Sequence, residues 1–234
     1  MIAADQPTIF GESPVVGLSS RRDGDMRFTT DDAKRHDQIH FLDEVSVELT
    51  QVTRLQASYD TTDFARYITL DDSYLGEGMI GDELTVHADA MVVTRPDHAI
   101  FLSLADCVGA VIYDEVAGVL MVSHLGRHST EIDGARQSVA YLTEQFDSNP
   151  ADLKVWLSPA VGRASYPLTA LDGKGLHEAI IEQLTSAGVP ADGIEASAVD
   201  TALNADYFSH SEHLAGRQTD DGRFAVVAMM RDWA

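Results

Sequence analysis

The stretch that decides the fold runs from Ala88 to Arg127 and reads A-D-A-M-V-V-T-R-P-D-H-A-I-F-L-S-L-A-D-C-V-G-A-V-I-Y-D-E-V-A-G-V-L-M-V-S-H-L-G-R. It contains apolar, β-branched runs that show no strict alternation of polar and apolar residues. Runs of this kind are typical of strands that are covered on both faces. We therefore predict buried strands over residues 90–94, 99–104, 110–113 and 118–123.

Helical patterns and further strand-like runs alternate on either side of this stretch. The predicted helices begin at polar residues, and one of them ends before a glycine and a proline, as helices commonly do. This alternation over residues 1–234 indicates a single domain of α/β (α+β layered) class, with a mixed β-sheet covered by helices. The helices are predicted at about 31–44, 129–146 and 175–187, and the further strands at 13–19, 45–54, 64–70, 155–157, 194–198 and 224–230.

The composition is strongly acidic, with 38 acidic against 16 basic residues and a formal net charge of -22. Such a surface repels phosphodiester backbones and anionic lipid, so we expect neither nucleic acid nor a membrane as a partner. No apolar run approaches the roughly 20 residues of a membrane span, and the N-terminus lacks the features of a signal peptide. We therefore expect a soluble cytoplasmic protein. The acid excess is consistent with salt adaptation or with drift in composition, and both remain open.

Cys107 is the only cysteine of the chain and directly follows the predicted strand 99–104 and the pair Ala105 and Asp106. A free cysteine is most often a buried and inert small side chain. At a strand end close to Gly109, however, backbone can approach a ligand. A thiol in that position acts as a metal ligand or a nucleophile only once it is deprotonated. Both roles are open for Cys107.

His124 stands at the end of another predicted strand, in the sequence S-H-L-G-R-H. If the two strand ends are neighbours in the sheet, Cys107 and His124 meet. The pair is then either half of a zinc site or a thiol nucleophile with its base.

Several short motifs occur in the order and approximate spacing of one known family. The central ones are A-D-A at 88–90, A-D-C at 105–107, H-x-G at 124–126 and W-L-S-P-A-V-G at 156–162. Two outer motifs, G-L-S-S-R at 17–21 and D-Y-F-S at 206–209, resemble that family's N-terminal substrate loop and its C-terminal aromatic-serine motif. Over nearly its whole length the chain resembles the laccase-domain family, which was named for multicopper polyphenol oxidoreductases.

The resemblance implies a laccase-domain fold similar to Cys-His toxin deamidase domains. It also implies a zinc-dependent purine nucleoside phosphorylase that acts on adenosine or inosine with phosphate, and in some members an adenosine deaminase. Copper-dependent phenol oxidation is not expected, because one cysteine and scattered histidines do not build several copper sites.

Members of the family hold one metal through the histidine of a Q-V-H-G motif, the cysteine of A-D-C and the histidine of H-A-G-W-R-G. The resemblance places the second and third ligands on Cys107 and His124. The first has no counterpart, because neither Q-A-S-Y at 56–59 nor Q-V-T at 51–53 contains a histidine. Zinc with only two protein ligands is held weakly, since catalytic sites normally provide three.

A replacement for the missing ligand is sought among nearby histidines. His128 is preferred over His87 and His210, because it follows His124 by four residues and one helical turn brings the two rings to one face. Asp106 is expected to orient a ligand histidine or to carry a proton, with a backbone-capping aspartate as the alternative.

Phosphate binding requires cations, and the two arginines that follow the aromatic-serine motif in the family are absent here. The resemblance places Ser19 and Arg21 in the substrate loop. Arg127 and Arg163 are the other expected substrate-binding residues, since guanidinium groups bind phosphate well.

The sequence leaves three functions open. The first is the zinc-dependent nucleoside phosphorylase, with Cys107, His124 and His128 as metal ligands. The second is a metal-free hydrolase or deamidase with Cys107 as nucleophile and His124 as base. The third is a diverged member that binds a ligand without catalysis. Tightly held zinc favours the first and a reactive metal-free thiol the second, whereas the absence of both favours the third.

Overall fold

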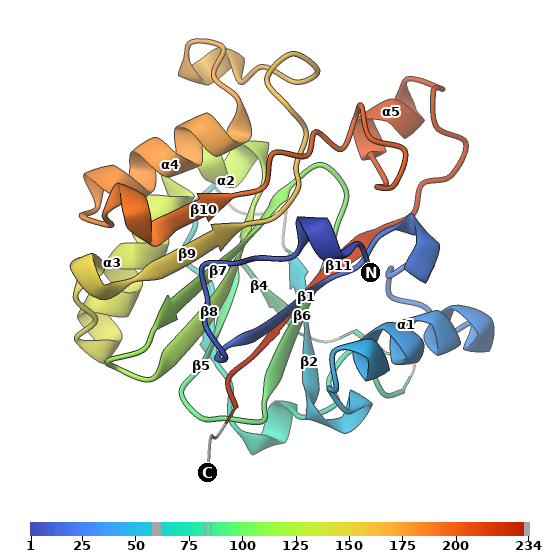
Figure 1. The fold of residues 1–234 in the computed structure, drawn as a ribbon, viewed down its shortest axis with the longest axis horizontal. Coiled ribbons are helices and arrows are strands. Elements are labelled where there is room, and N and C mark those ends of the chain that lie inside the picture. The colour runs from blue at the N-terminus through green and yellow to red at the C-terminus, as the bar shows by residue number, and fades with distance from the viewer. Residues whose placement is uncertain (58–61, 82, 85, 232–234) are drawn as a thin grey trace.

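The computed structural model of the chain describes residues 1–57, 62–81, 83–84 and 86–231. Its elements form four layers, in which two β-sheets face each other and helices cover the outer side of each sheet (Figure 1). Helix α1 (Asp32–Glu44) covers the first sheet, and α3 (Gly134–Phe146) with α4 (Leu176–Ser186) covers the second. The predicted layered α/β class is confirmed, but the strands form two mixed sheets instead of one.

The first sheet is mixed, with β2 parallel to β4 and β6 and the other neighbours antiparallel. Phe101 and Val227 of this sheet pack with Phe41 of α1 on the outer face. Within the described residues the spatial order is β1 (Val15–Leu18), β11 (Phe224–Met229), β6 (Ala99–Leu104), β2 (Val52–Ala57) and β4 (His87–Ala88).

The second sheet is also mixed, with antiparallel pairs at its centre and parallel pairs at both edges. Its outer face carries Val139 of α3 and Ile180 of α4. Within the described residues the spatial order is β10 (Ile194–Ala196), β9 (Lys154–Leu157), β7 (Val108–Asp114), β8 (Val119–Leu125), β5 (Ala90–Val93) and β3 (Tyr67–Thr69).

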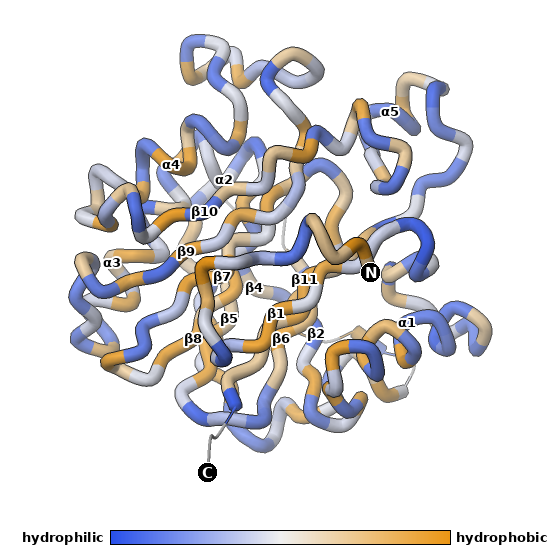
Figure 2. Tube along the Cα trace, viewed as in Figure 1, coloured by the Kyte–Doolittle hydropathy of each residue, from blue (hydrophilic) through white to orange (hydrophobic). Residues whose placement is uncertain are grey.

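The space between the two sheets is filled by apolar side chains from both. Val226 of β11 faces it from the first sheet, and Val122 of β8 and the fully buried Trp156 of β9 face it from the second. Figure 2 shows the same distribution, with hydrophobic residues along the central strands and hydrophilic ones in the loops. Strands covered on both faces therefore explain why the sequence lacks alternation.

The region predicted as one helix over 129–146 forms two helices, α2 (Arg127–Glu131) and α3. Between them Asp133 adopts a left-handed backbone with φ 68°, a conformation that ends a helix. A short helix that was not predicted, α5 (His210–Leu214), follows the aromatic-serine motif. No described helix is both long and apolar enough to cross a lipid bilayer. Single 3-10 turns occupy Ala3–Asp5, Arg21–Asp23, Leu49–Gln51, Asp72–Tyr74, Pro150–Asp152, Thr169–Leu171 and Ala191–Gly193.

The strand predicted over 45–54 is displaced toward the C-terminus. Glu48 and Gln51 cap a 3-10 turn over Leu49–Gln51, so the strand begins only at Val52 and continues to Ala57. By contrast, the predicted strand 99–104 has the same bounds as β6.

Candidate functional site

Cys107 and His124 lie beside each other at one end of the second sheet. In the antiparallel pair of β7 and β8, Gly109 faces His124 and Val108 faces Leu125, and Cys107 directly precedes β7. A Cβ atom added to Gly126 would lie 2.8 Å from Cys107 Sγ and 3.5 Å from His124 Cε1. The structure thus brings together the two residues that the sequence singles out, and Gly126 leaves the space between them open.

The strand pattern places His124 on the inner face of its sheet. Leu120, Val122 and His124 are alternate residues of β8, and the first two belong to the core between the sheets. Cys107 also packs against this core. The last inward position of the strand is therefore occupied by an imidazole, where the core ends and a cavity begins.

Burial determines the charge of this pair. Burial raises the pKa of the Cys107 thiol to about 12, and the negative charge of Asp106 acts in the same direction, against a weaker opposing effect of Arg223. Burial lowers the pKa of His124 to about 4. At neutral pH the pair is a thiol beside a neutral imidazole. Reactive cysteines instead occupy electropositive surroundings that lower the thiol pKa, so this geometry gives no support to the metal-free Cys-His hydrolase.

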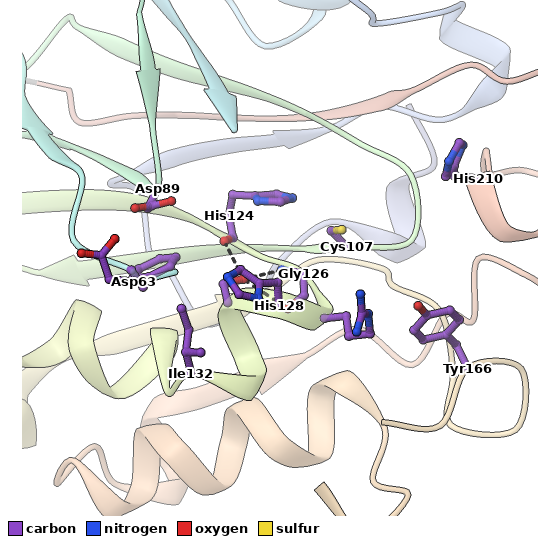
Figure 3. A pocket seen from close by; sticks show the side chains of 12 residues that line it. Asp63, Asp89, Cys107, His124, Gly126, His128, Ile132, Tyr166 and His210 are labelled. Atoms are coloured by element: carbon purple, nitrogen blue, oxygen red, sulfur yellow. Dashed lines mark hydrogen bonds between the residues drawn. The ribbon is translucent and has the colours of Figure 1, made fainter. Parts of the chain in front are cut away.

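A cavity of about 350 Å³ opens in front of this pair. Figure 3 shows Asp63 and Asp89 at one end of it, His210 at the other, and His124 and Cys107 between them. The lining residues are Asp63, Phe64, Asp89, Cys107, His124, Gly126, Arg127, His128, Ser129, Ile132, Tyr166 and His210.

A second, smaller cavity of about 180 Å³ adjoins the first. Cys107, Arg127, Tyr166 and His210 line both cavities. The smaller one is more apolar, since aliphatic side chains form much of its wall. These are Ala105, Val161, Leu176 and Leu214.

Helix α2 contributes the cationic side of the larger cavity. Arg127, at the first position of the helix, lines both cavities and forms an ion pair with Glu131, at 3.5 Å between Nη1 and Oε2. His128 follows it and also lines the larger cavity. Of the predicted phosphate-binding arginines, Arg127 is the one that the structure places beside Cys107 and His124.

Within the part of the chain that the structure describes, the potential metal donors at the cavity are fewer than a catalytic zinc ion requires. Among the described residues, no three histidine, cysteine, aspartate or glutamate side chains lie close enough together to hold a metal ion. Cys107 and His124 provide two donors. His128 and His210 line the cavity without completing such a group, and His87 is exposed and lines neither cavity.

The described residues therefore do not fit a three-ligand zinc site. Of the Q-A-S-Y segment that corresponds to the family's first ligand motif, Ser58 and Tyr59 lie outside the described residues. The other candidate segment, Gln51–Thr53, contains no metal-ligating side chain of the required type. Zinc binding stays a prediction for this chain.

Asp106 has a structural contact for each of its carboxylate oxygens. Its Oδ1 accepts a hydrogen bond from Thr201 Oγ1 at 2.7 Å, and its Oδ2 accepts one from the backbone N–H of Ser211 at 2.7 Å. The residue lies in the turn between β6 and β7 with φ 79°. Its geometry corresponds to the capping alternative, although the backbone that it caps is distant in sequence.

Three predicted substrate-binding residues line neither cavity. Ser19 is fully buried, and its hydroxyl accepts a hydrogen bond from the backbone N–H of Ala225 at 2.8 Å. The structure pairs Arg21 with Asp220 at 2.9 Å, and Arg163 with Glu178 at 3.3 Å. Each of these groups is thus held by a partner outside the two cavities, and its substrate-binding role stays a prediction.

Other lining residues were not identified from the sequence. Asp89 stands in the A-D-A motif, which offered a signal, and its Oδ2 accepts hydrogen bonds from the backbone N–H groups of Ala65 and Arg66 at 3.2 and 2.9 Å. Asp63 and Tyr166 stand in segments without any recognisable motif, and only the folded chain brings them to the cavity.

Known proteins resemble this chain in sequence. A purine nucleoside phosphorylase of Bacteroides thetaiotaomicron is 25% identical over 114 residues, which are 48% of this chain and 41% of that protein. Purine nucleoside phosphorylase YlmD of Bacillus subtilis is 36% identical over 69 residues, which are 29% of this chain and 25% of that protein. The chain thus matches less than half the length of either relative.

The fold has a counterpart among solved structures. YlmD from Geobacillus stearothermophilus superimposes with a TM-score of 0.82 at 20% identity, over 97% of this chain and 94% of that one. The family model of the multi-copper polyphenol oxidoreductase laccases matches residues 28–172, a segment that contains Cys107, His124 and the motifs around them. The predicted resemblance is therefore confirmed, and the chain belongs to the multi-copper polyphenol oxidoreductase laccase family.

Proposed function

We propose that this chain is a purine nucleoside phosphorylase, which cleaves the glycosidic bond of inosine or adenosine with phosphate. The observation that carries the proposal is the cavity of about 350 Å³ at which Cys107, His124, Arg127 and Tyr166 meet. Two relatives named purine nucleoside phosphorylase match the chain in part and support the same reaction class.

The size and lining of the cavity suit a nucleoside. Small-molecule sites usually measure about 300–1,000 Å³ and combine apolar walls with a few polar groups. Here Tyr166 offers aromatic surface for a purine, and Asp63 and Asp89 offer carboxylates for sugar hydroxyls.

Arg127 is the proposed phosphate-binding residue. Its exposed side chain has a glutamate partner four residues away, and pairs at this spacing on a helix contribute only about 0.5 kcal/mol. A phosphate dianion therefore displaces Glu131 readily and gains two hydrogen bonds from the planar guanidinium.

In phosphorolysis an oxygen of phosphate forms a bond to the ribose C1′ while the bond from C1′ to the purine nitrogen breaks. The electron pair of the broken bond passes to the base, which then takes a proton. Arg127 orients the phosphate and neutralises part of its charge, and Tyr166 helps to hold the base. Zinc is not assigned a step, because the described residues supply two donors for it.

The test measures release of the free base from inosine and from adenosine, with and without phosphate. We expect phosphate-dependent release and a fall of roughly a hundredfold in kcat/KM for phosphate in Arg127→Ala. Arg136→Ala is the matched control, since Arg136 is also an exposed, ion-paired arginine but lies on α3 and lines neither site cavity.

Further readouts separate the alternatives. Ammonia release from adenosine without phosphate would replace phosphorolysis by deamination. Zinc content and activity are compared before and after dialysis against a chelator, which decides whether a metal takes part. A wild-type protein that releases neither base nor ammonia, with or without added zinc, would leave the non-catalytic ligand-binding hypothesis.

A further inference from the structure

His210 lies at the boundary of the two cavities. It is one of the residues that line both, together with Cys107, Arg127 and Tyr166. In Figure 3 it stands opposite the acidic end of the larger cavity, beyond Cys107. A ligand that extends from the polar cavity into the apolar one therefore passes this histidine.

Asp221 fixes the arrangement of protons on this ring. His210 Nδ1 lies 2.9 Å from Asp221 Oδ1, and the same oxygen accepts a hydrogen bond from Arg223 Nη1 at 2.8 Å. Arg27 Nη2 lies 3.6 Å from the other oxygen. Burial would raise the pKa of Asp221, but the hydrogen bonds from His210 and Arg223 outweigh it and hold the pKa at about 2.

An ionised carboxylate only accepts hydrogen bonds, so Nδ1 of His210 must carry the hydrogen. In the neutral ring Nε2 is then the nitrogen with the lone pair, and in the charged ring Nε2 carries the second proton. The histidine of this pair is thus prepared to exchange a proton at Nε2, while Asp221 holds the ring orientation.

The two cavities differ in a way that matches the two parts of a nucleoside. The larger one carries Asp63, Asp89 and Arg127, which suit ribose and phosphate. The smaller one carries Val161 and Leu176 in its wall, which suit a purine base. In that orientation the glycosidic bond lies at the boundary of the cavities, beside His210.

We propose that His210 is the acid that protonates the leaving purine, and that Asp221 is the residue that positions it. The inference rests on the proposed nucleoside phosphorylase function. As phosphate bonds to C1′ and the bond from C1′ to the base breaks, Nε2–H of His210 donates its proton to the base. The resulting neutral ring recovers a proton from water.

The experiment compares inosine with 7-methylinosine as substrates of wild type and His210→Gln. Methylation at N7 places a positive charge on the purine, so this base leaves without taking a proton. We expect His210→Gln to lower kcat with inosine by roughly a hundredfold or more, and with 7-methylinosine by less than about threefold. The second substrate also shows that the variant is folded.

His213→Gln is the matched control, because His213 lies on the same helix α5 but lines neither cavity. It should leave both substrates unaffected. Equal losses of His210→Gln on both substrates, or no loss on either, would overturn the proposal. Phosphorolysis of neither substrate by wild type would instead overturn the proposed function on which it rests.

Asp221→Asn tests the positioning role. An asparagine amide can donate to Nδ1 and favours the wrong tautomer, so we expect a lower kcat for inosine with KM changed by less than about twofold. Nitrogen NMR of His210 provides a readout without substrate: Nδ1 should carry the hydrogen in the neutral ring of wild type. A neutral ring that is protonated at Nε2 in wild type contradicts the proposed geometry, whatever the activity.

Discussion

Two pairs of side chains each place a histidine at the larger cavity, and the pairs differ in burial and in charge. Cys107 and His124 extend the strands β7 and β8 and form a neutral pair, with His124 only 7% exposed. His210 and Asp221 join α5 to the loop before β11, and the His210 side chain is 45% exposed beside an ionised carboxylate. Histidine thus has a different environment at each position, buried on a strand for His124 and partly exposed on a helix for His210.

The difference follows from what each element does to water. A strand ladder between packed layers removes solvent, and burial favours the neutral forms of thiol and imidazole. The wall formed by α5 and the loop before β11, here called the loop wall, stays accessible to solvent. It also brings Arg223 and Asp221 together, so both side chains remain charged. The wall formed by the adjoining ends of β7 and β8, here called the strand wall, suits binding and orientation of a ligand. The loop wall suits proton exchange with water.

The largest expected effect is on the labelling rate of Cys107, which tests whether its thiol is neutral in the folded protein. Because burial raises the pKa of Cys107 to about 12, we expect iodoacetamide at neutral pH to alkylate the folded, metal-stripped protein roughly a hundredfold more slowly than the urea-unfolded chain. Intact-mass spectrometry follows the reaction, and the unfolded chain is the control. Equal rates would mean that the thiol is accessible and keeps its ordinary pKa, which contradicts the expectation, and a faster rate in the folded protein would restore the metal-free Cys-His hydrolase hypothesis.

A methyl group at Gly126 sharpens the comparison by testing how rigid the strand wall is. Its Cβ would lie 2.8 Å from Cys107 Sγ, so Gly126→Ala should lower the free energy of unfolding by about 1–3 kcal/mol. Gly11→Ala is the matched control, since a Cβ there meets nothing within 4 Å, and it should change stability by less than about 0.5 kcal/mol. Urea unfolding measures both, and a neutral Gly126→Ala would show that the wall yields.

The smallest effect concerns the loop wall and its pH dependence. The folded pKa of Asp221 lies at about 2, below the ordinary value of 3.8, so its contribution is present above about pH 4 and is lost as the pH falls toward 2. With screening at this partly exposed position, we expect Asp221→Asn to cost about 1 kcal/mol at neutral pH. Urea unfolding at several pH values should show this difference shrinking in acid, and a constant difference would contradict it.

The sequence predicted the individual strands better than their assembly. The bounds of β6 and the approximate limits of α1 followed from runs and caps that are local in sequence. The division into two sheets did not follow, because strands buried on both faces carry no alternation that tells an inner from an outer side. The break at Asp133 was also missed, since aspartate adopts a left-handed conformation only in some contexts.

The same distinction between local and long-range information applies to the residues of the site. Cys107 and His124 were predicted because short motifs carry them, and the β7 and β8 register then brought them together. The ion pair of Arg21 with Asp220 could not be predicted, because Asp220 is distant in sequence and no local pattern indicates the pair. The contact of His210 with Asp221 spans a loop, so the sequence around the histidine gave no indication of its partner.

Asp106 has a consequence for the divergence and the redesign of this protein. Its carboxylate joins the β6 and β7 turn to Thr201 and to Ser211, and so holds the C-terminal wall against the strands. The contact at position 211 uses a backbone N–H, which every residue except proline supplies, whereas the contact at position 201 requires a hydroxyl. Position 211 can therefore vary without loss of this anchor, whereas a substitution that removes the hydroxyl at position 201 would loosen the wall that carries His210.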